Sequence, residues 1–259
     1  MSRSNPTGEK PQNPCTRFFE WNGEEGYFYY YDKEAKQKVE VKLPFAFLVL
    51  DQLSTIKGWS DADQSAIWSN EVKYLDKQKL AVFTKKGKQV EGIYEVIKGK
   101  VSGSKYTKAV YVAYYNAQKQ LEICCILMSG ASLNAWIEFT GNHNVNKGAI
   151  RVESFTTGKK GKVEYRMPAF IGFDCKPETD AKATELDKVL QAYLTEYFAY
   201  SESYKPEQSK EEKDAIKASA DHLEYARPKE ESRGASRLEE ESAPIVSSNS
   251  GLPADFEEF

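Results

Sequence analysis

KYTKAVYVAYYNAQ, from Lys105 to Gln118, combines β-branched residues and tyrosines between polar ends, a composition typical of a β-strand. The stretches before it, KLAVFTKKG and VEGIYEVIKGKV (Val90–Val101), have the same character, and turns rich in Gly, Ser and Lys separate them. LEICCILMSG and ASLNAWIEF follow it and are compatible with a strand or a helix, because a short apolar run does not distinguish the two. The centre of the chain therefore predicts a meander of β-strands.

Two predicted hairpins flank this meander. GYFYYYD (Gly26–Asp32) is followed by a short Lys/Glu-rich loop and then by KVEVKL, and GKKG joins AIRVESFTT to KVEYRMPAFIGF. FAFLVLDQLSTI (Phe45–Ile56) is more continuously apolar and fits a buried strand. GWSDADQSAIWSNEV (Gly58–Val72) predicts a polar loop or a short helix that carries two tryptophans.

The pattern becomes helical toward the end of the folded part. Apolar residues spaced three and four apart predict an amphipathic helix over Thr179–Tyr200, with Thr179 and Asp180 as N-cap candidates. Residues 1–14 hold three prolines and no periodicity, so we expect a disordered arm before a folded domain over 15–204. Residues 205–259 are too poor in apolar residues to build a core and predict a disordered acidic tail.

Charge is divided unevenly along the chain, although the net charge is only −3. The tail carries 8 Lys and Arg against 14 Asp and Glu, whereas residues 85–166 carry 14 against 6. A basic centre next to an acidic end is the kind of asymmetry associated with nucleic-acid binding.

Basic and aromatic residues interleave within that basic segment. Single-stranded nucleic acid is bound by rings that stack on bases and by cations that neutralise phosphates, so both types must share one surface. The alternative is that Tyr111 or Tyr115 is core and that the lysines solvate edge strands. Tyr27–Tyr31 is a second candidate platform, and Trp59, Trp68 and Trp136 are more typical of core or interface anchors. The predicted nucleic-acid-binding residues are Lys98, Lys100, Lys105, Tyr106, Lys108, Tyr111, Tyr114, Tyr115, Lys159, Lys160, Lys162 and Arg166, with Tyr165 beside them.

Enzyme and metal signatures are weak. The sequence has no phosphate-binding loop, dinucleotide fingerprint or zinc-protease motif, and only two histidines. SDADQS resembles the start of a calcium loop, but Ala66 stands where such a loop needs Gly and Val72 where it needs Glu. The four cysteines have neither zinc-site spacing nor a disulfide framework. We expect no catalytic residues, no metal and no cofactor.

The opening MSRSNPTGEKPQNP has no apolar core region of a signal peptide, and no run approaches the length of a membrane span. We expect a cytoplasmic protein with no membrane partner.

The last residues, LPADFEEF, place Asp255, Glu257 and Glu258 beside Phe256 and a terminal Phe259. This end resembles the acidic tips of bacterial single-stranded DNA-binding proteins and of the T7-like phage replication binding proteins. The resemblance implies that these five residues bind replication proteins such as a polymerase, helicase or primase.

The body, including WSDADQSAIWSNEV, resembles the single-stranded DNA-binding proteins of crAss-like phages over about residues 15–200. That resemblance implies an OB-like, five-stranded Greek-key barrel with insertions, and, for a phage protein, the host cytoplasm as its location. The function it implies is non-catalytic coating of single-stranded DNA in replication or recombination. The alternatives are a strand-annealing or recombination mediator and a virion or structural interaction protein.

Overall fold

The computed structural model describes residues 11–203, and these residues fall into two compact units. The larger unit runs from Gln12 to Tyr193 and carries the strands. The described part of the second unit is Pro11 together with Leu194–Ser203, the end of the last helix. The predicted tail, with its tip Asp255–Phe259, and most of the predicted arm lie outside the described residues.

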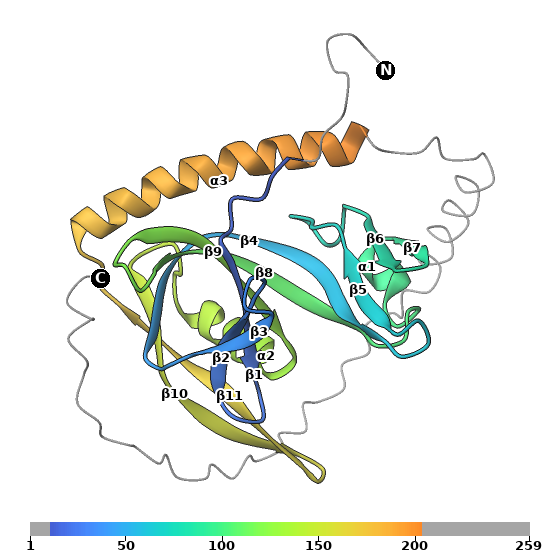
Figure 1. The fold of residues 1–259 in the computed structure, drawn as a ribbon, viewed down its shortest axis with the longest axis horizontal. Coiled ribbons are helices and arrows are strands. Elements are labelled where there is room, and N and C mark those ends of the chain that lie inside the picture. The colour runs from blue at the N-terminus through green and yellow to red at the C-terminus, as the bar shows by residue number, and fades with distance from the viewer. Residues whose placement is uncertain (1–10, 204–259) are drawn as a thin grey trace, which may run out of the picture. The chain divides into compact units, whose positions relative to one another are not determined.

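The fold is mainly β, as predicted (Figure 1). Eleven strands and three helices follow one another along the described chain. In order they are β1 (Arg17–Asn22), β2 (Tyr27–Asp32), β3 (Gln37–Val41), β4 (Phe45–Ser60), β5 (Ser65–Ser69), β6 (Leu80–Thr84), β7 (Gly87–Gly92), α1 (Tyr94–Ile97), β8 (Ser104–Tyr115), β9 (Leu121–Ser129), α2 (Gly130–Asn142), β10 (Ala149–Lys160), β11 (Val163–Phe173) and α3 (Pro177–Ser203).

The strands form one sheet in the order β3-β2-β1-β9-β8-β4-β5-β6-β7, in which β1 and β9 are parallel. The hairpin β10–β11 branches from the start of β4, where Ile150–Val152 pair with Phe45–Phe47. The two ends of the path, β3 and β7, do not pair with each other, so the sheet is open. The closed OB-like barrel is therefore not confirmed.

Several predicted elements are confirmed. Both hairpins are present, as β2–β3 and β10–β11, and the helix near the C-terminal end of the body is α3. α3 begins at Pro177, before the predicted caps, because proline lacks an N–H and suits the first helical position. The two stretches after β8 that were compatible with a strand or a helix, LEICCILMSG and ASLNAWIEF, form strand β9 and helix α2 respectively.

Two predictions are wrong. The stretch over Gly58–Val72 is neither a simple loop nor a helix: β4 continues to Ser60, turns, and returns as β5. The segment Val90–Val101 is not one strand either, because β7 ends at Gly92 and the short helix α1 follows.

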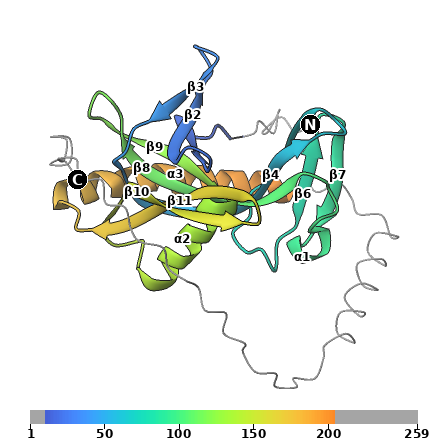
Figure 2. The ribbon, with the colours of Figure 1, turned by 90° about the horizontal axis from the view of Figure 1, so that it is seen from below.

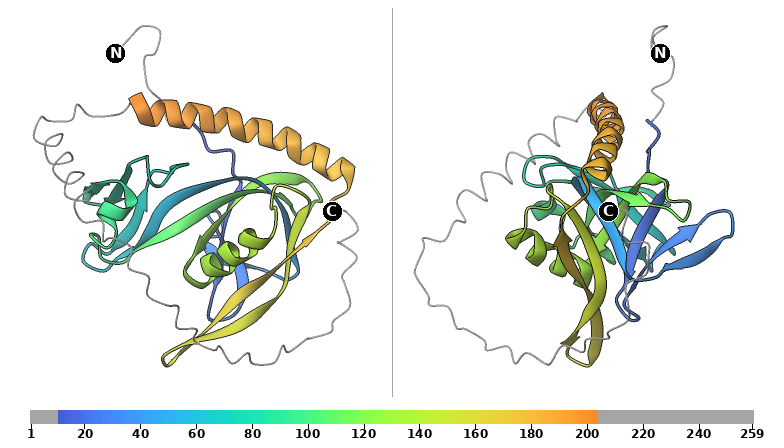
Figure 3. Two further views of the ribbon diagram at one scale, coloured as in Figure 1. Left: turned by 180° about the vertical axis from the view of Figure 1, so that it is seen from behind. Right: turned by 90° about the vertical axis from the view of Figure 1, so that its left-hand side faces the viewer.

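Both faces of the central strands are covered. On one face, Val110 and Val112 of β8 belong to the main hydrophobic cluster, which also includes Phe45 of β4 and Trp136 of α2. On the other face, Leu48 and Ala113 pack with Ala183 of α3. Views from below and from the side show α2 on one side of these strands (Figures 2 and 3). Two-sided burial explains the continuously apolar runs in β4, β8 and β9.

The sheet continues beyond these layers through the second half of β4 and β5–β7. There one face carries a smaller hydrophobic cluster, built from Ile56, Ile67, Val72, Leu80, Val82 and Ile97. Side chains alternate between faces along a strand, so the residues next to these in sequence point to the opposite face. That opposite face is the candidate site.

No helix in the described range has both the length and the apolar character needed to cross a membrane.

Candidate nucleic-acid interface

A row of basic and aromatic side chains crosses five neighbouring strands on this opposite face. Lys57 of β4 is paired on one side with Lys105 of β8 and on the other with Trp68 of β5. Trp68 is paired with Phe83 of β6, and Phe83 with Lys88 of β7. Residues directly opposite each other on neighbouring strands share a face and lie close together. We call the sequence Lys105, Lys57, Trp68, Phe83, Lys88, together with Trp59, the aromatic row.

Trp59 belongs to this row because it lies two residues after Lys57 and therefore on the same face. Trp59 is 53% exposed and Trp68 is 41% exposed, although large aromatic rings are normally mostly buried. The ring of Trp68 stacks on Phe83, with centroids 6.2 Å apart and planes inclined by 17°. The row thus presents flat apolar rings to solvent between lysines.

The lysines of the row supply positive charge with few competing acids. Neither Lys57 nor Lys105 forms an ion pair with a described residue, whereas Lys88 pairs with the exposed Glu91 at 2.7 Å. Neighbouring strands lie about 4.8 Å apart, so five strands place the end residues of the row about 19 Å apart. This is long enough for several consecutive nucleotides.

Asp63 fixes the turn that carries the tryptophans. Its carboxylate accepts a hydrogen bond from the Thr84 hydroxyl at 2.7 Å and forms an ion pair with Lys86 at 2.6 Å. The β4–β5 turn is thereby tied to the β6–β7 turn, at the end of the row. In the stretch that resembles the start of a calcium loop, the Asp63 carboxylate is thus engaged by Thr84 and Lys86.

Stability should depend on the charge of Asp63. Hydrogen bonds from Lys86 and Thr84 lower the pKa of the Asp63 carboxyl below its ordinary value. A carboxyl with a depressed pKa in the folded state stabilises the fold above the unfolded pKa of about 3.9, and this contribution is lost as pH falls through the folded pKa. We therefore expect urea denaturation to show a stability gap between wild type and Asp63→Asn at pH near 6 that shrinks below pH of about 4. A gap that stays constant with pH would contradict this role.

A close approach of two backbones sets the position of Trp59 and Lys57. Gly58 of β4 and Gly103, just before β8, have φ angles of 157° and 81°. A Cβ built on Gly103 would overlap the carbonyl of Trp59, and one built on Gly58 would overlap the carbonyl of Gly103. Only residues without a side chain allow the strands to meet here.

The tyrosines predicted to stack on bases do not lie on an exposed surface. Tyr111 is fully buried and donates a hydrogen bond to Glu71 at 2.6 Å, and burial raises the pKa of its hydroxyl. Tyr114 packs edge-on against Phe19, with ring centroids 5.2 Å apart, and the Tyr115 hydroxyl is 3.3 Å from that of Thr179. The prediction of a stacking surface at Tyr111 is wrong, because α2 and α3 cover both faces of β8.

Tyr106 and its neighbours lie on the side opposite the row. The Tyr106 hydroxyl hydrogen-bonds with Ser54 at 3.0 Å, and its ring lies 5.2 Å from that of Tyr94. Lys108 is partly buried, and burial lowers the pKa of its ammonium group. Lys98 and Lys100 are exposed after α1, which packs on the smaller cluster through Ile97. Among the predicted residues of this segment, Lys105 is the one that the structure places in the aromatic row.

The remaining predicted residues belong to the β10–β11 hairpin. Lys159, Lys160 and Lys162 are exposed at its tip. The Arg166 side chain already has partners within the protein: its guanidinium donates a hydrogen bond to the Glu24 carbonyl and lies 5.0 Å from the ring centroid of Phe155. The hairpin residues are therefore separate from the row.

In the second candidate platform, on β2, Phe28 and Tyr29 already make contacts within the protein. Phe28 is buried in the main cluster, and the Tyr29 hydroxyl donates to Glu20 at 2.6 Å. Tyr31 is 56% exposed, but it lies on β2 and does not belong to the aromatic row. Trp136 is buried, as a core anchor should be, and its indole donates to Gln52 at 3.0 Å.

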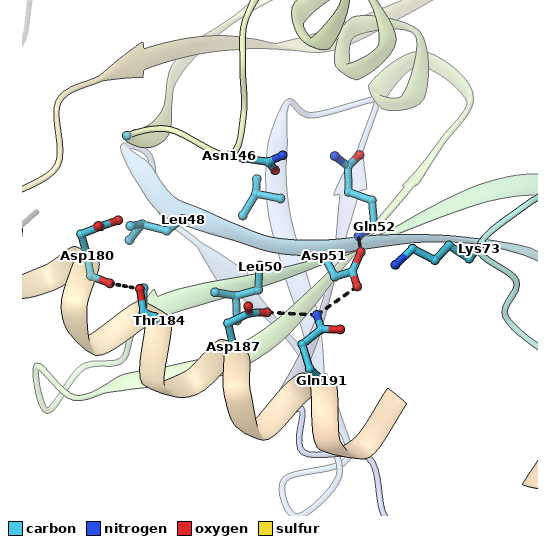
Figure 4. Close-up of a pocket in the computed structure, with 13 residues that line it drawn as sticks. Leu48, Leu50, Asp51, Gln52, Lys73, Asn146, Asp180, Thr184, Asp187 and Gln191 are labelled. Atoms are coloured by element: carbon cyan, nitrogen blue, oxygen red, sulfur yellow. Dashed lines mark hydrogen bonds between the residues drawn. The ribbon is translucent and has the colours of Figure 1, made fainter. Parts of the chain in front are cut away.

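A cleft of about 480 Å³ between β4 and α3 has no arrangement of reactive groups (Figure 4). Two of its carboxylates, Asp51 and Asp187, both accept hydrogen bonds from the Gln191 amide at 3.1 Å. The Asp51 carboxylate also accepts the backbone N–H of Gln52 at 2.7 Å. These contacts attach α3 to β4, and we assign the cleft no chemistry.

Sequence reasoning missed Trp68, Phe83 and Lys57 as a set. The alternation in SAIWS, with Ile67 between Ala66 and Trp68, was the available signal for a strand with one exposed face. Pairing of that strand with β4 and β6 could not be inferred from the local pattern.

Comparison with protein-family models, with curated proteins and with solved structures finds no match to this chain.

Proposed function

We propose that the protein binds single-stranded DNA without catalysing a reaction, and that the aromatic row is its binding surface. The observation that carries the proposal is that lysines and aromatic rings, among them the exposed Trp59 and Trp68, share one face across five neighbouring strands. Unpaired bases expose their faces, and stacking on an aromatic ring contributes about 1–3 kcal/mol per base. Duplex DNA hides those faces, so this chemistry favours single strands.

The arrangement of the row also suits binding without sequence preference. Stacking tolerates any base, and lysines neutralise phosphates as point charges that read no sequence. Such a surface serves to coat single strands during replication or recombination. An OB-like barrel is not required for this proposal, because the open sheet already supplies the platform. Recruitment of replication proteins by Asp255–Phe259 is part of the same proposal, and these residues lie outside the described range.

Salt titration tests the electrostatic half of the proposal. Single-strand binding releases counterions with a slope of about −0.7 per neutralised phosphate in a plot of log K against log salt. Three lysines in the row therefore predict a slope of about −2 for a labelled single-stranded oligonucleotide in fluorescence anisotropy. Lys57→Ala combined with Lys105→Ala should reduce the slope to about −0.7.

The matched control removes two exposed lysines at the start of α3, Lys176→Ala just before the helix together with Lys182→Ala in its second turn, and should leave the slope unchanged. Equal binding of single-stranded and double-stranded oligonucleotides of the same sequence, or a slope near zero, would refute the proposal.

A further inference from the structure

The β10–β11 hairpin ends in a free two-stranded ribbon. β10 pairs with β4 only through Ile150–Val152, and beyond that point its partner within the described chain is β11. We call Gly158–Tyr165 the tip ribbon; its pairs are Gly158 with Tyr165, Lys159 with Glu164 and Lys160 with Val163. Figure 1 shows this end of the hairpin extending away from the sheet.

The base of the tip ribbon is held firmly. The Arg166 backbone N–H donates to the Gly23 carbonyl at 2.7 Å, and the Trp21 indole donates to the Arg166 carbonyl at 2.8 Å. Gly26 allows close packing here, since a Cβ at this position would meet Phe155 at 2.7 Å. The β1–β2 turn therefore fixes the direction of the ribbon up to Arg166, and the tip ribbon projects beyond this support.

Charge on the tip ribbon is distributed over both of its faces. Lys159 and Lys160 are consecutive in a strand and so point to opposite faces, while Lys162 occupies the turn. Glu164 lies opposite Lys159, but their charged atoms are 3.9 Å apart and the side chains are 70% and 65% exposed. An exposed ion pair of this kind is worth little and leaves Lys159 available.

The tip ribbon lacks a free ring for stacking. Its aromatic residue, Tyr165, lies over Gly158, where a Cβ would come within 2.6 Å of the ring. Apart from this ring, the side chains of the ribbon are three lysines, Glu164 and the 65%-exposed Val163. It can therefore contact phosphates but is poorly suited to unpaired bases, unlike the aromatic row.

We infer that the tip ribbon binds double-stranded DNA while the aromatic row holds a single strand, so that the protein prefers DNA that contains both, such as a duplex with a single-stranded tail. The inference rests on the proposed function for the single-stranded part. The major groove of B-DNA is about 12 Å wide, admits a two-stranded ribbon and has phosphates along both walls. Lysines on both faces of a ribbon that enters tip first match those two walls, whereas a flat single-strand path would need them on one face. A four-residue arm reaches roughly 13 Å, which exceeds the groove depth of about 8.5 Å.

The experiment compares three labelled DNAs in fluorescence anisotropy: a single strand, a blunt duplex, and the same duplex carrying that single strand as a tail. Wild type should bind the tailed duplex on the order of tenfold more tightly than the single strand, with a salt slope steeper by up to about 2.7 for three further phosphates at about 0.9 each. Lys159→Ala, Lys160→Ala and Lys162→Ala combined should remove this advantage and leave single-strand affinity unchanged. The control with the same charge change, Lys176→Ala, Lys182→Ala and Lys188→Ala combined, should keep it.

The possible failures can be told apart. Equal affinity of wild type for the tailed duplex and the single strand overturns the inference and leaves the aromatic row intact. An equal loss by the tip variant on both DNAs also overturns it, because the tip would then belong to the single-strand path. If wild type fails to bind the single strand, the proposed function is refuted and the inference about the tip ribbon, which rests on it, is refuted with it.

Discussion

Replacing Trp59 and Trp68 together by Ala should weaken single-strand binding by about thirtyfold or more. Each ring that stacks on a base contributes about 1–3 kcal/mol, and 1.4 kcal/mol corresponds to a factor of ten in Kd. Both rings are substantially exposed, so the free energy of unfolding should change little, apart from the loss of stacking between Trp68 and Phe83. Fluorescence anisotropy gives the affinity, and thermal melting of the same samples gives the stability.

The matched control is Tyr31→Ala, which removes an equally exposed ring from β2. This variant should bind like wild type. If Tyr31→Ala loses affinity and the Trp double variant does not, the stacking platform lies on β2 and the aromatic row is not the site.

Tyr111→Ala should produce the opposite result, a large loss of stability without a change in the binding surface. Removing a buried aromatic ring costs about 3–5 kcal/mol, and here the hydrogen bond from the Tyr111 hydroxyl to Glu71 would also be lost. Tyr111→Phe keeps the ring and should lose about 1–3 kcal/mol, since only the hydroxyl is removed. Urea denaturation measures both losses, and anisotropy at a temperature where the variants are folded measures binding.

A Tyr111→Ala protein of normal stability that no longer bound DNA would contradict this assignment to the core. It would return Tyr111 to the binding surface that the sequence predicts.

Local patterns predicted the hairpins and α3 because each depends on a short-range rule. GKKG and the aromatic run Tyr27–Tyr31 mark strands joined by turns, and the spacing of Leu186, Leu190 and Tyr193 marks one face of a helix. The end of β4 and β5 were misread because Gly58, Asp61 and Asp63 suggest a loop, although Gly58 lies within β4 and only Asp61 and Asp63 belong to the turn between the strands.

The sequence predicts which types of residue form the proposed binding surface, but not which strands carry it. Aromatic and basic residues are spread over much of the chain, and which of them are exposed depends on which faces distant elements cover. The Tyr115 hydroxyl is within hydrogen-bonding distance of the Thr179 hydroxyl, 64 residues later in the chain. The Trp21 indole donates a hydrogen bond to the backbone carbonyl of Arg166, 145 residues later. By contrast, Trp68 remains 41% exposed, and its ring stacks on Phe83 of the neighbouring strand. Such coverage is a property of the tertiary fold.

The length of β4 has a consequence for how rigid the binding surface is. This single strand of 16 residues contributes Phe45 and Phe47 to the main hydrophobic cluster and Ile56 to the smaller one. The smaller cluster cannot open without pulling on a strand whose other half is buried between two layers, so local opening and global unfolding are coupled. The rings of the aromatic row are therefore preorganised: their freedom is largely lost when the chain folds, and little more is lost when a ligand binds.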